Sequence, residues 1–351
     1  MKILFVANGD EKANGRFFYS PDRKIAHGMI QNGHHVWFFS DRDIARNSTF
    51  FKTRKLGVKK CNERFILTFK NLIPDLVVLG NSKIITNSSL EEVRKIHPSV
   101  RIIQFNVDAI FNKNNALKIL DRAPHVDASF VTTAGKSLKQ FDTERSTTYF
   151  IPNPVDPSIE STANYLRDEL KNDVFCAMRR ARKPIPESPR HIIPTRILHE
   201  LPDLRPSFHG FNNAGELYGA AYFKTLSECK MGLNLSQTFS TESLEPANKE
   251  DLYLYSSDRI SHYMGCGLLT FIDSIFGYQD LFTDQEMVFY DSYDELIDKI
   301  KFYASNNTQL RNIAKNGSER YHALMNNQIV ARYMIERTFK SKLQHAYHWV
   351  T

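Results

Sequence analysis

Four arginines in the second half of the chain have the residue type and the placement that phosphate binding requires. Arg179, Arg180 and Arg182 directly follow an apolar run that is typical of a buried strand. The fourth, Arg259, comes directly after a group of helix-capping residues. Guanidinium groups bind phosphate oxygens through paired hydrogen bonds, and ligands of open α/β sheets bind beyond the carboxyl ends of the strands. The pattern predicts a ring of basic groups around a diphosphate; the alternative is a solvated loop at 179–182.

The residues around Arg259 predict a short helix that presents its amino end to an anion. Ser257 and Asp258 are of the types that begin a helix, because their side-chain oxygens accept bonds from unpaired backbone N–H groups. His262 lies one turn further along the same face, and a buried strand is expected at 268–272. The positive end of a helix suits a diphosphate. We therefore assign Ser257, Asp258, Arg259 and His262 to one anion site.

Two other strand ends are expected in the same row. Asn234 and Ser236 lie at the end of the apolar run 231–235, and His209 follows the run 205–208. Because parallel strands end at a common edge, these side chains are expected near the arginines. The alternative is that they are ordinary polar residues at strand ends.

These segments resemble the donor-binding half of GT-B glycosyltransferases, nearest the CgeB-like family with a "glycosyl transferases group 1" C-terminal half. The run G-L-N-L-S at 232–236 matches a strand end beside the nucleotide in that family, and I-P-N-P-V-D at 151–156 matches its interdomain segment. The turn G-H-H-V at 33–36 is similar to the start of the second strand in many GT-B enzymes. The resemblance implies that the anion is the diphosphate of a nucleotide-sugar donor, and that Arg259 also stabilises charge on the leaving nucleotide.

Two positions depart from the family pattern. Many relatives have a glutamate that binds the donor ribose where this chain has His262, which is not a permanent anion. Leu254 stands where retaining families have the first of two glutamates. The sugar and the stereochemistry therefore stay open.

The alternation of strands and helices predicts an α/β protein of the GT-B class, with two Rossmann-like domains facing a central cleft. Three prolines between 152 and 157 interrupt the pattern and predict an interdomain linker. We expect an acceptor-binding domain at 1–152 and a donor-binding domain at 158–325. A final segment, 326–351, is expected to form a helix that crosses back to the first domain, as the resemblance implies.

Composition is that of a folded protein with a basic first half. Apolar residues make up 42% of the 351 residues and charged residues 24%. Residues 1–157 hold 24 Lys and Arg against 15 Asp and Glu, whereas the remainder holds 22 against 24. The excess suits an anionic acceptor, an anionic membrane surface or nucleic acid, or is simply a soluble surface. Four cysteines without C-x-x-C spacing, and no apolar run approaching the roughly 18 residues of a membrane span, favour a cytoplasmic protein.

A base that deprotonates the acceptor is expected in the first domain if the enzyme inverts. Asp108 follows the strand expected at 101–106 and is our first candidate, with a helix cap as the alternative. The D-x-D at 41–43 is similar to a metal motif of another glycosyltransferase fold, but here a cap or surface loop is favoured. We expect no essential metal and no cofactor other than the nucleotide-sugar. Weaker candidates for the base are Asp10, Asp22 and His27.

The resemblance implies transfer of a sugar to a glycan or glycolipid in bacterial lipopolysaccharide or surface polysaccharide synthesis, at the inner face of the cytoplasmic membrane. A basic cluster at 52–60, expected in a loop-like region, would meet lipid phosphates there. Three alternatives remain: a DNA-modifying glucosyltransferase, a nucleotide-sugar epimerase, and a non-catalytic protein that binds sugar nucleotides.

Overall fold

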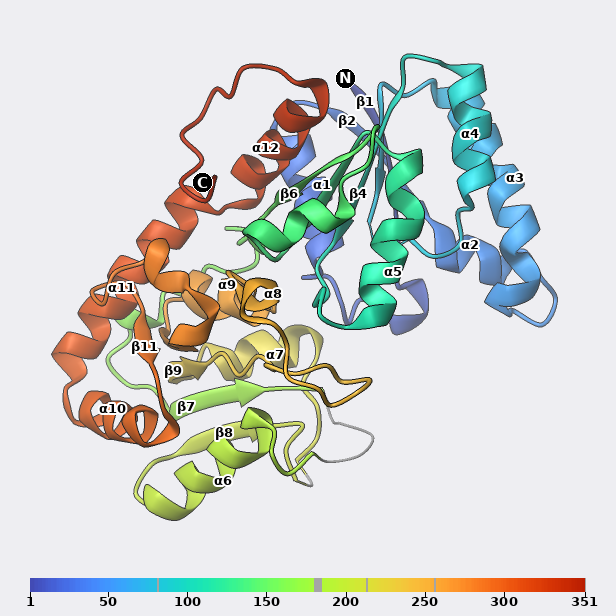
Figure 1. Cartoon of the computed structure of the whole chain (residues 1–351). Helices are drawn as coiled ribbons and strands as arrows, with labels where there is room; N and C mark the ends of the chain where they lie inside the picture. The colour runs from blue at the N-terminus through green and yellow to red at the C-terminus, as the bar shows by residue number, and fades with distance from the viewer. Residues whose placement is uncertain (81, 180–184, 213, 256, 351) are drawn as a thin grey trace. The chain divides into compact units, whose positions relative to one another are not determined.

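The computed structural model describes residues 1–351 except 81, 180–184, 213, 256 and 351 (Figure 1). Its contacts divide the chain into two compact units. The first unit comprises residues 1–152 together with 327–351, and the second comprises residues 153–326. Each unit is built around one parallel sheet. The linker expected at 152–157 therefore begins at the division and continues into the second unit.

The first unit has a six-stranded sheet in the order β2-β1-β3-β4-β5-β6, and every neighbouring pair is parallel. Parallel neighbours need a crossover between them, and helices supply most of these crossovers. The strands are β1 (Lys2–Ala7), β2 (His35–Ser40), β3 (Leu76–Leu79), β4 (Arg101–Asn106), β5 (Ala128–Val131) and β6 (Thr147–Phe150). The helices are α1 (Pro21–Gln31), α2 (Asp41–Asn47), α3 (Arg54–Leu72), α4 (Asn87–Ile96), α5 (Lys113–Arg122) and α12 (Asn327–Phe339).

Helix α12 belongs to the first unit because it packs directly on α1. A Cβ at Gly28 of α1 would lie 2.0 Å from the carbonyl oxygen of Asn327, so only glycine permits this approach. Asn32 donates from Nδ2 to the carbonyl oxygen of Gln328 at 2.8 Å. Tyr333 of α12 also lies edge-on to Phe130 of the sheet. The last helix thus covers one face of the sheet.

The second unit has a five-stranded parallel sheet in the order β11-β10-β9-β7-β8. Buried side chains of α6, α10 and α11 pack on one face of this sheet, and those of α7 and α9 pack with the other face. The strands are β7 (Asn172–Ala177), β8 (Pro206–His209), β9 (Cys229–Leu233), β10 (Leu269–Asp273) and β11 (Val288–Tyr290). The helices are α6 (Pro189–Glu200), α7 (Gly219–Leu226), α8 (Lys249–Leu252), α9 (Arg259–Gly265), α10 (Tyr293–Ser305) and α11 (Asn307–Leu324).

The loop expected at 52–60 is wrong beyond Thr53, because α3 begins at Arg54 and runs for 19 residues. Its buried face contains Cys61, Phe65 and Phe69, which recur at the four-residue spacing of one helix face. The many lysines and polar residues between these positions obscure that spacing. The basic residues at 54–60 therefore project from a helix rather than a loop.

Candidate functional site

Two arginines converge on one carbonyl oxygen at the carboxyl edge of the second unit's sheet. Arg259 donates from Nη2 to the oxygen of Leu235 at 2.9 Å, and Arg190 donates from Nε to the same oxygen at 3.0 Å. Within the described part of the chain, neither guanidinium forms an ion pair with a carboxylate. The edge therefore carries two close guanidinium groups that no described carboxylate contacts directly.

The two arginines differ in how the protein alone treats their charge: burial opposes ionisation of Arg259, but the nearby Tyr263, Cys176 and Asp258 outweigh it and raise its pKa. Burial and the neighbouring Arg259 guanidinium lower the pKa of Arg190 to about 10. Arg259 is only 8% exposed, and its Nε is buried without a hydrogen-bond partner among the described residues. Buried charges of one sign are stable when an opposite charge accompanies them. The site is therefore complementary to an anion.

Helices from opposite faces of the sheet supply the two arginines. Arg190 lies in the first turn of α6, where Ser188 is the N-cap residue and Pro189 occupies the first helical position. The Ser188 hydroxyl accepts the Arg190 N–H at 3.3 Å. Arg259 is the first residue of α9, which packs on the other face. The first turns of α6 and α9 thus meet at the end of β9.

Close packing of α9 on the sheet fixes the position of Arg259. A Cβ at Gly232 of β9 would lie 2.7 Å from the ring of Tyr263, so the absent side chain lets that ring sit on the strand. The Tyr263 ring is fully buried and also meets Phe175 of β7 edge-on. The glycine of the G-L-N-L-S run therefore has a packing role.

The polar residues that end β9 leave further donors at the same edge. The Asn234 N–H donates to the oxygen of Phe271 at 3.0 Å, and Asn234 Oδ1 accepts from the Ser257 hydroxyl at 3.3 Å. Asn234 Nδ2 and Ser236 Oγ are buried without a partner among the described residues. Buried polar groups are nearly always hydrogen-bonded in folded proteins. Together with Arg259 Nε, these groups mark the place of an oxygen-rich ligand.

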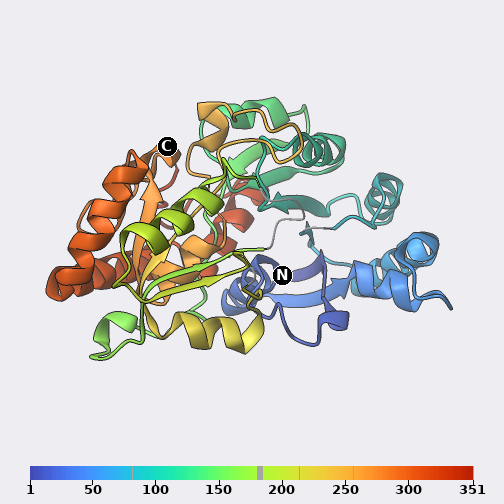
Figure 2. The same ribbon diagram turned by 90° about the horizontal axis from the view of Figure 1, so that it is seen from below.

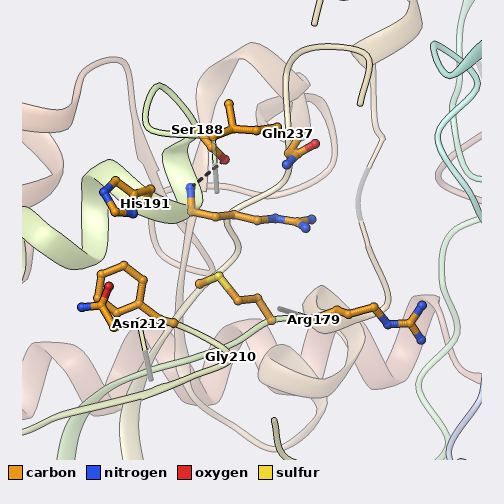
Figure 3. Close-up of a pocket in the computed structure, with 10 residues that line it drawn as sticks. Arg179, Ser188, His191, Gly210, Asn212 and Gln237 are labelled. Carbon is orange, nitrogen blue, oxygen red and sulfur yellow. Dashed lines mark hydrogen bonds between the residues drawn. The ribbon is translucent and has the colours of Figure 1, made fainter. Parts of the chain in front are cut away.

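A pocket of about 160 Å³ opens beside Arg190 (Figure 3). Ser188 and Gln237 lie on one side of it, and Gly210 and Arg179 lie on the opposite side. Apolar and polar side chains line it together, which is typical of sites for small organic ligands. The lining residues are Met178, Arg179, Ile185, Ser188, Arg190, His191, Gly210, Phe211, Asn212 and Gln237.

Arg179, one of the three arginines expected after β7, is exposed and lines this pocket. Arg180 and Arg182 lie outside the described residues. Arg190 was not expected from the sequence, although Ser188 and Pro189 form a helix-start pattern directly before it. The three arginines at 179–182 formed the stronger phosphate-binding pattern, and the phosphate site was therefore predicted there.

His209 ends β8, as expected, and is half-buried. Its Nε2 lies 3.0 Å from the hydroxyl of Ser207, and burial lowers the pKa of the imidazole. Its ring lies near that of Phe175. The next residue, Gly210, lines the pocket, whereas His209 is not among the lining residues. Its assignment to the donor site stays a prediction.

The structure places His262 in a buried pair within the second unit. Its Nδ1 lies 2.6 Å from Oε1 of Glu160, and both side chains are almost fully buried. The ring packs edge-on against Tyr222 and Phe223, and its Nε2 lies 3.8 Å from Asp258. His262 thus holds Glu160 against α9 and does not line the pocket. Asp258 is the N-cap residue of α9, so the predicted helix start is confirmed, but its side chain makes no cap hydrogen bond.

Asp108 lies in the first unit and is exposed in the loop after β4, where its N–H donates to Asn106 Oδ1 at 2.7 Å. The alternative role as the cap of α5 is wrong, because Asn112 is the N-cap residue of that helix. A pocket of about 250 Å³ lies nearby at the ends of β3 and β4. Lys83 lines this pocket. Burial and the neighbouring Lys118 and Arg42 lower the pKa of its ammonium group, whereas the Asp108 carboxylate acts in the opposite direction. The role of Asp108 as a base stays a prediction.

The carboxylates of the D-x-D motif are buried in α2 and already hydrogen-bonded. Asp41 accepts from the Ser82 hydroxyl at 3.0 Å and from the N–H groups of Lys83 and Ile84. Asp43 accepts from Arg46 Nη1 at 2.5 Å. Among the described residues, no group of three His, Cys, Asp or Glu side chains is arranged to hold a metal ion. No helix in the described ranges is both long and apolar enough to span a bilayer.

Residues 182–336 match a protein family described as "Glycosyl transferase-like", whereas no curated protein sequence matches the chain significantly. Solved structures that are similar over nearly the whole chain include the following three. A sucrose-phosphate synthase from Thermosynechococcus elongatus is 12% identical, with a TM-score of 0.57 over 97% of this chain and 98% of its own. An alpha-glucosyltransferase, solved with UDP-glucose and DNA containing an abasic site, is 11% identical, with a TM-score of 0.61 over 96% and 99%. Anabaena HepE, solved with UDP-glucose, is 14% identical, with a TM-score of 0.55 over 97% and 100%.

The likeness to these structures establishes the fold, and the matched family adds the kind of domain. The resemblance to GT-B glycosyltransferases and the fold class expected from the sequence are both confirmed. The chain contains a glycosyl transferase-like domain at residues 182–336 and has, over nearly its whole length, the GT-B fold of nucleotide-sugar-dependent glycosyltransferases.

Proposed function

We propose that the protein is a nucleotide-sugar-dependent glycosyltransferase whose donor binds at the carboxyl edge of the second unit's sheet. The observation that carries this proposal is the pair of Arg190 and Arg259 guanidinium groups on the Leu235 carbonyl, without a carboxylate partner in the described chain. A donor diphosphate supplies the missing negative charge. Its oxygens also accept from the buried donors of Asn234 and Ser236.

The same charges serve the chemistry. When the bond between the sugar and the diphosphate breaks, negative charge builds up on the leaving phosphate. Fixed guanidinium groups in a partly buried site stabilise that charge without reorganising, and so lower the barrier. Arg259, whose Nε is free of a partner among the described residues, is the residue we assign to this role. Because two arginines balance the diphosphate, we propose transfer that needs no metal ion.

The pocket beside Arg190 is proposed to hold the nucleoside. Met178 and Phe211, which line the pocket, offer apolar contacts to a base. Asn212 and Gln237 (Figure 3) offer hydrogen bonds that distinguish one base from another. Arg179 lies at the same pocket and is exposed, so we place it at the phosphates or the ribose. Ser257 and Asp258 are assigned to the phosphate side, and His209 and His262 retain a supporting role in holding this edge.

The acceptor is proposed to be a glycan or glycolipid of bacterial lipopolysaccharide or surface polysaccharide synthesis, bound by the first unit with Asp108 as the base. The positive excess of residues 1–157 suits an acceptor that carries phosphate or carboxylate groups. The same excess supports a second candidate, a DNA-modifying glucosyltransferase. The structural similarity to an alpha-glucosyltransferase solved with DNA motivates that alternative. Strong salt-dependent binding of duplex DNA would favour it.

The proposal is tested by incubating the protein with UDP-, GDP-, ADP- and CMP-sugars and measuring release of the free nucleotide. Many transferases hydrolyse their donor slowly in the absence of an acceptor, so we expect release from one nucleotide family. The rate should be the same with EDTA and with Mg²⁺, and it should fall in Arg259→Ala. A protein that binds a donor but never releases nucleotide, even with a lipid-linked or glycan acceptor panel, would be a binding protein and would refute transfer.

A further inference from the structure

Two phenylalanines in the loop between α2 and α3 are exposed in a way that folding does not explain. Phe50 is 94% exposed and Phe51 is 73% exposed, and Phe50 is the most exposed large apolar side chain of the described residues. Their rings contact one another edge-on, with centroids 5.4 Å apart. The loop projects at the ends of α2 and α3 (Figure 1 and Figure 2). Such side chains usually mark a surface that another body covers.

The chain around these rings is basic on every side. No Asp or Glu occurs between Asp43 and Glu63. Leu56, in the first turn of α3, is a further exposed apolar residue at 64% exposure. Five cations follow Phe51, and none of them forms an ion pair with a described carboxylate: Lys52, Arg54, Lys55, Lys59 and Lys60. We call Phe50, Phe51 and these five cations the aromatic tip.

We propose that the aromatic tip docks the protein on an anionic lipid bilayer, with the two phenyl rings inserted at the level of the lipid headgroups. Moving apolar rings out of water lowers the free energy of the system. The cations that follow the rings are attracted electrostatically to the phosphates of anionic lipids. One contact alone gives weak and reversible attachment to a membrane, whereas an apolar anchor and a basic cluster reinforce each other. The tip supplies both within eleven residues, 50–60.

The chemistry of the tip favours lipid over nucleic acid. Single-stranded nucleic acid is bound by aromatic rings whose flat faces are free to stack on bases. Here one ring turns its edge to the face of the other, which leaves fewer free faces, and the nearby Leu56 has no face that stacks. Sequence-specific contacts to bases need polar groups such as Arg, Asn or Gln at the contact, and Arg54 is the one residue of these types in the tip. An apolar pair followed by four ammonium groups and one guanidinium group instead matches the apolar-to-anionic gradient of a bilayer surface.

Docking by the tip is independent of sugar transfer, because the tip lies in the first unit and the candidate donor site lies in the second. The two can therefore fail separately. A protein that binds nucleotide but not vesicles would refute the tip alone, and one that binds vesicles but no nucleotide would refute the donor site alone.

The test is co-sedimentation of the full-length protein with vesicles of phosphatidylcholine and phosphatidylglycerol in equal parts, and with vesicles of phosphatidylcholine alone. We expect binding to the first and little to the second, with binding that weakens as salt is added. Phe50→Ser with Phe51→Ser should lower the partition coefficient about tenfold or more. Each of Lys52→Gln and Lys55→Gln should lower it about fivefold.

The matched control is Leu117→Ser with Leu166→Ser, which removes two exposed apolar side chains elsewhere. This variant should bind vesicles as the wild type does. Because the replaced side chains are exposed, every variant should keep the thermal midpoint of the wild type. Equal binding by the Phe50→Ser/Phe51→Ser variant, or no binding to anionic vesicles, would overturn the proposal. Tip-dependent binding of DNA without binding of vesicles would replace it with a nucleic-acid site.

Discussion

The two edges of the second unit's sheet differ in whether their positive charges have carboxylate partners. At the amino edge, Asp173 of β7 accepts two bonds from the guanidinium of Arg205, each at 3.0 Å, and lies 2.8 Å from Lys230 Nζ. At the carboxyl edge, Arg190 and Arg259 share a neutral carbonyl oxygen and have no described carboxylate partner. The first edge is neutralised by the protein, and the second is left for a ligand. The difference identifies the functional edge.

The pKa shifts follow the same division. Burial opposes ionisation of Asp173, but hydrogen bonds from Arg205 and Lys230 outweigh it and lower the pKa of the carboxyl to about 2. Burial and Arg259 lower the pKa of Arg190 to about 10, so the charged form of Arg190 is disfavoured. The amino edge thus gains stability from its charges. At the carboxyl edge the charge of Arg190 costs stability, which is common where a site is prepared for a partner, whereas Tyr263, Cys176 and Asp258 outweigh burial and raise the pKa of Arg259.

The largest expected effect comes from removing both site arginines. Arg190→Met with Arg259→Met should weaken binding of the nucleotide-sugar by at least about 100-fold, or roughly 3 kcal/mol, because two charge-assisted contacts to the diphosphate are lost. Titration calorimetry measures this directly. The matched control is Arg196→Met on the same helix, where the arginine pairs with Glu200 and Asp294 at the surface. If the control loses affinity equally, the comparison between edges fails.

A substitution at the amino edge should change the stability of the protein but not its affinity for nucleotide. Asp173→Asn should lower the free energy of unfolding by about 2 kcal/mol at neutral pH, because Arg205 and Lys230 lose their counter-ion. A depressed pKa contributes stability above the unfolded pKa, here 3.8, and that stability is lost as pH falls through about 2. The wild type should therefore lose this difference between pH 4 and pH 2 while the variant does not. Denaturant unfolding measures both, and nucleotide affinity should stay unchanged.

A smaller effect of opposite sign is expected when one site arginine is removed from the free protein. Arg190→Met should raise the free energy of unfolding by about 1 kcal/mol without ligand, because repulsion from Arg259 disappears. The same variant should lose most of its response to nucleotide. A clear loss of stability in the free variant would show that the pair is structural.

The smallest effect is expected at Ser236. Because its buried hydroxyl has no partner among the described residues, Ser236→Ala should leave the free protein unchanged within about 0.5 kcal/mol. Donor affinity should fall about fivefold, which corresponds to one neutral hydrogen bond. An unchanged affinity would remove Ser236 from the donor site.

The parts of the site that the sequence predicted depend on short-range patterns. Capping residues before Arg259 and polar residues after an apolar run locate strand and helix ends, and parallel strands then bring those ends together. A helix start directly before Arg190 was also indicated, by the pair Ser188 and Pro189. The phosphate site was nevertheless assigned to the longer arginine run at 179–182. Helix α3 was missed because lysines interrupt its apolar spacing.

Other features depend on long-range packing and had no local signal. His262 meets Glu160, which lies 102 residues earlier in the chain, and this pair removes the imidazole from the pocket lining. The convergence of α6 and α9 on the Leu235 carbonyl likewise depends on which face of the sheet each helix covers. Spacing alone does not encode that choice.

The central claim is that the carboxyl edge of the second unit binds the diphosphate of a nucleotide-sugar. A thermal-shift screen of the wild type and Arg259→Ala against UDP-, GDP-, ADP- and CMP-sugars, the free nucleotides and the parent nucleosides tests it most directly. A ligand that binds only the folded state raises the midpoint. We predict that one nucleotide family stabilises the wild type, that its nucleoside does not, and that Arg259→Ala loses the effect. A wild type that responds to none of them, with EDTA or with Mg²⁺, would contradict the claim.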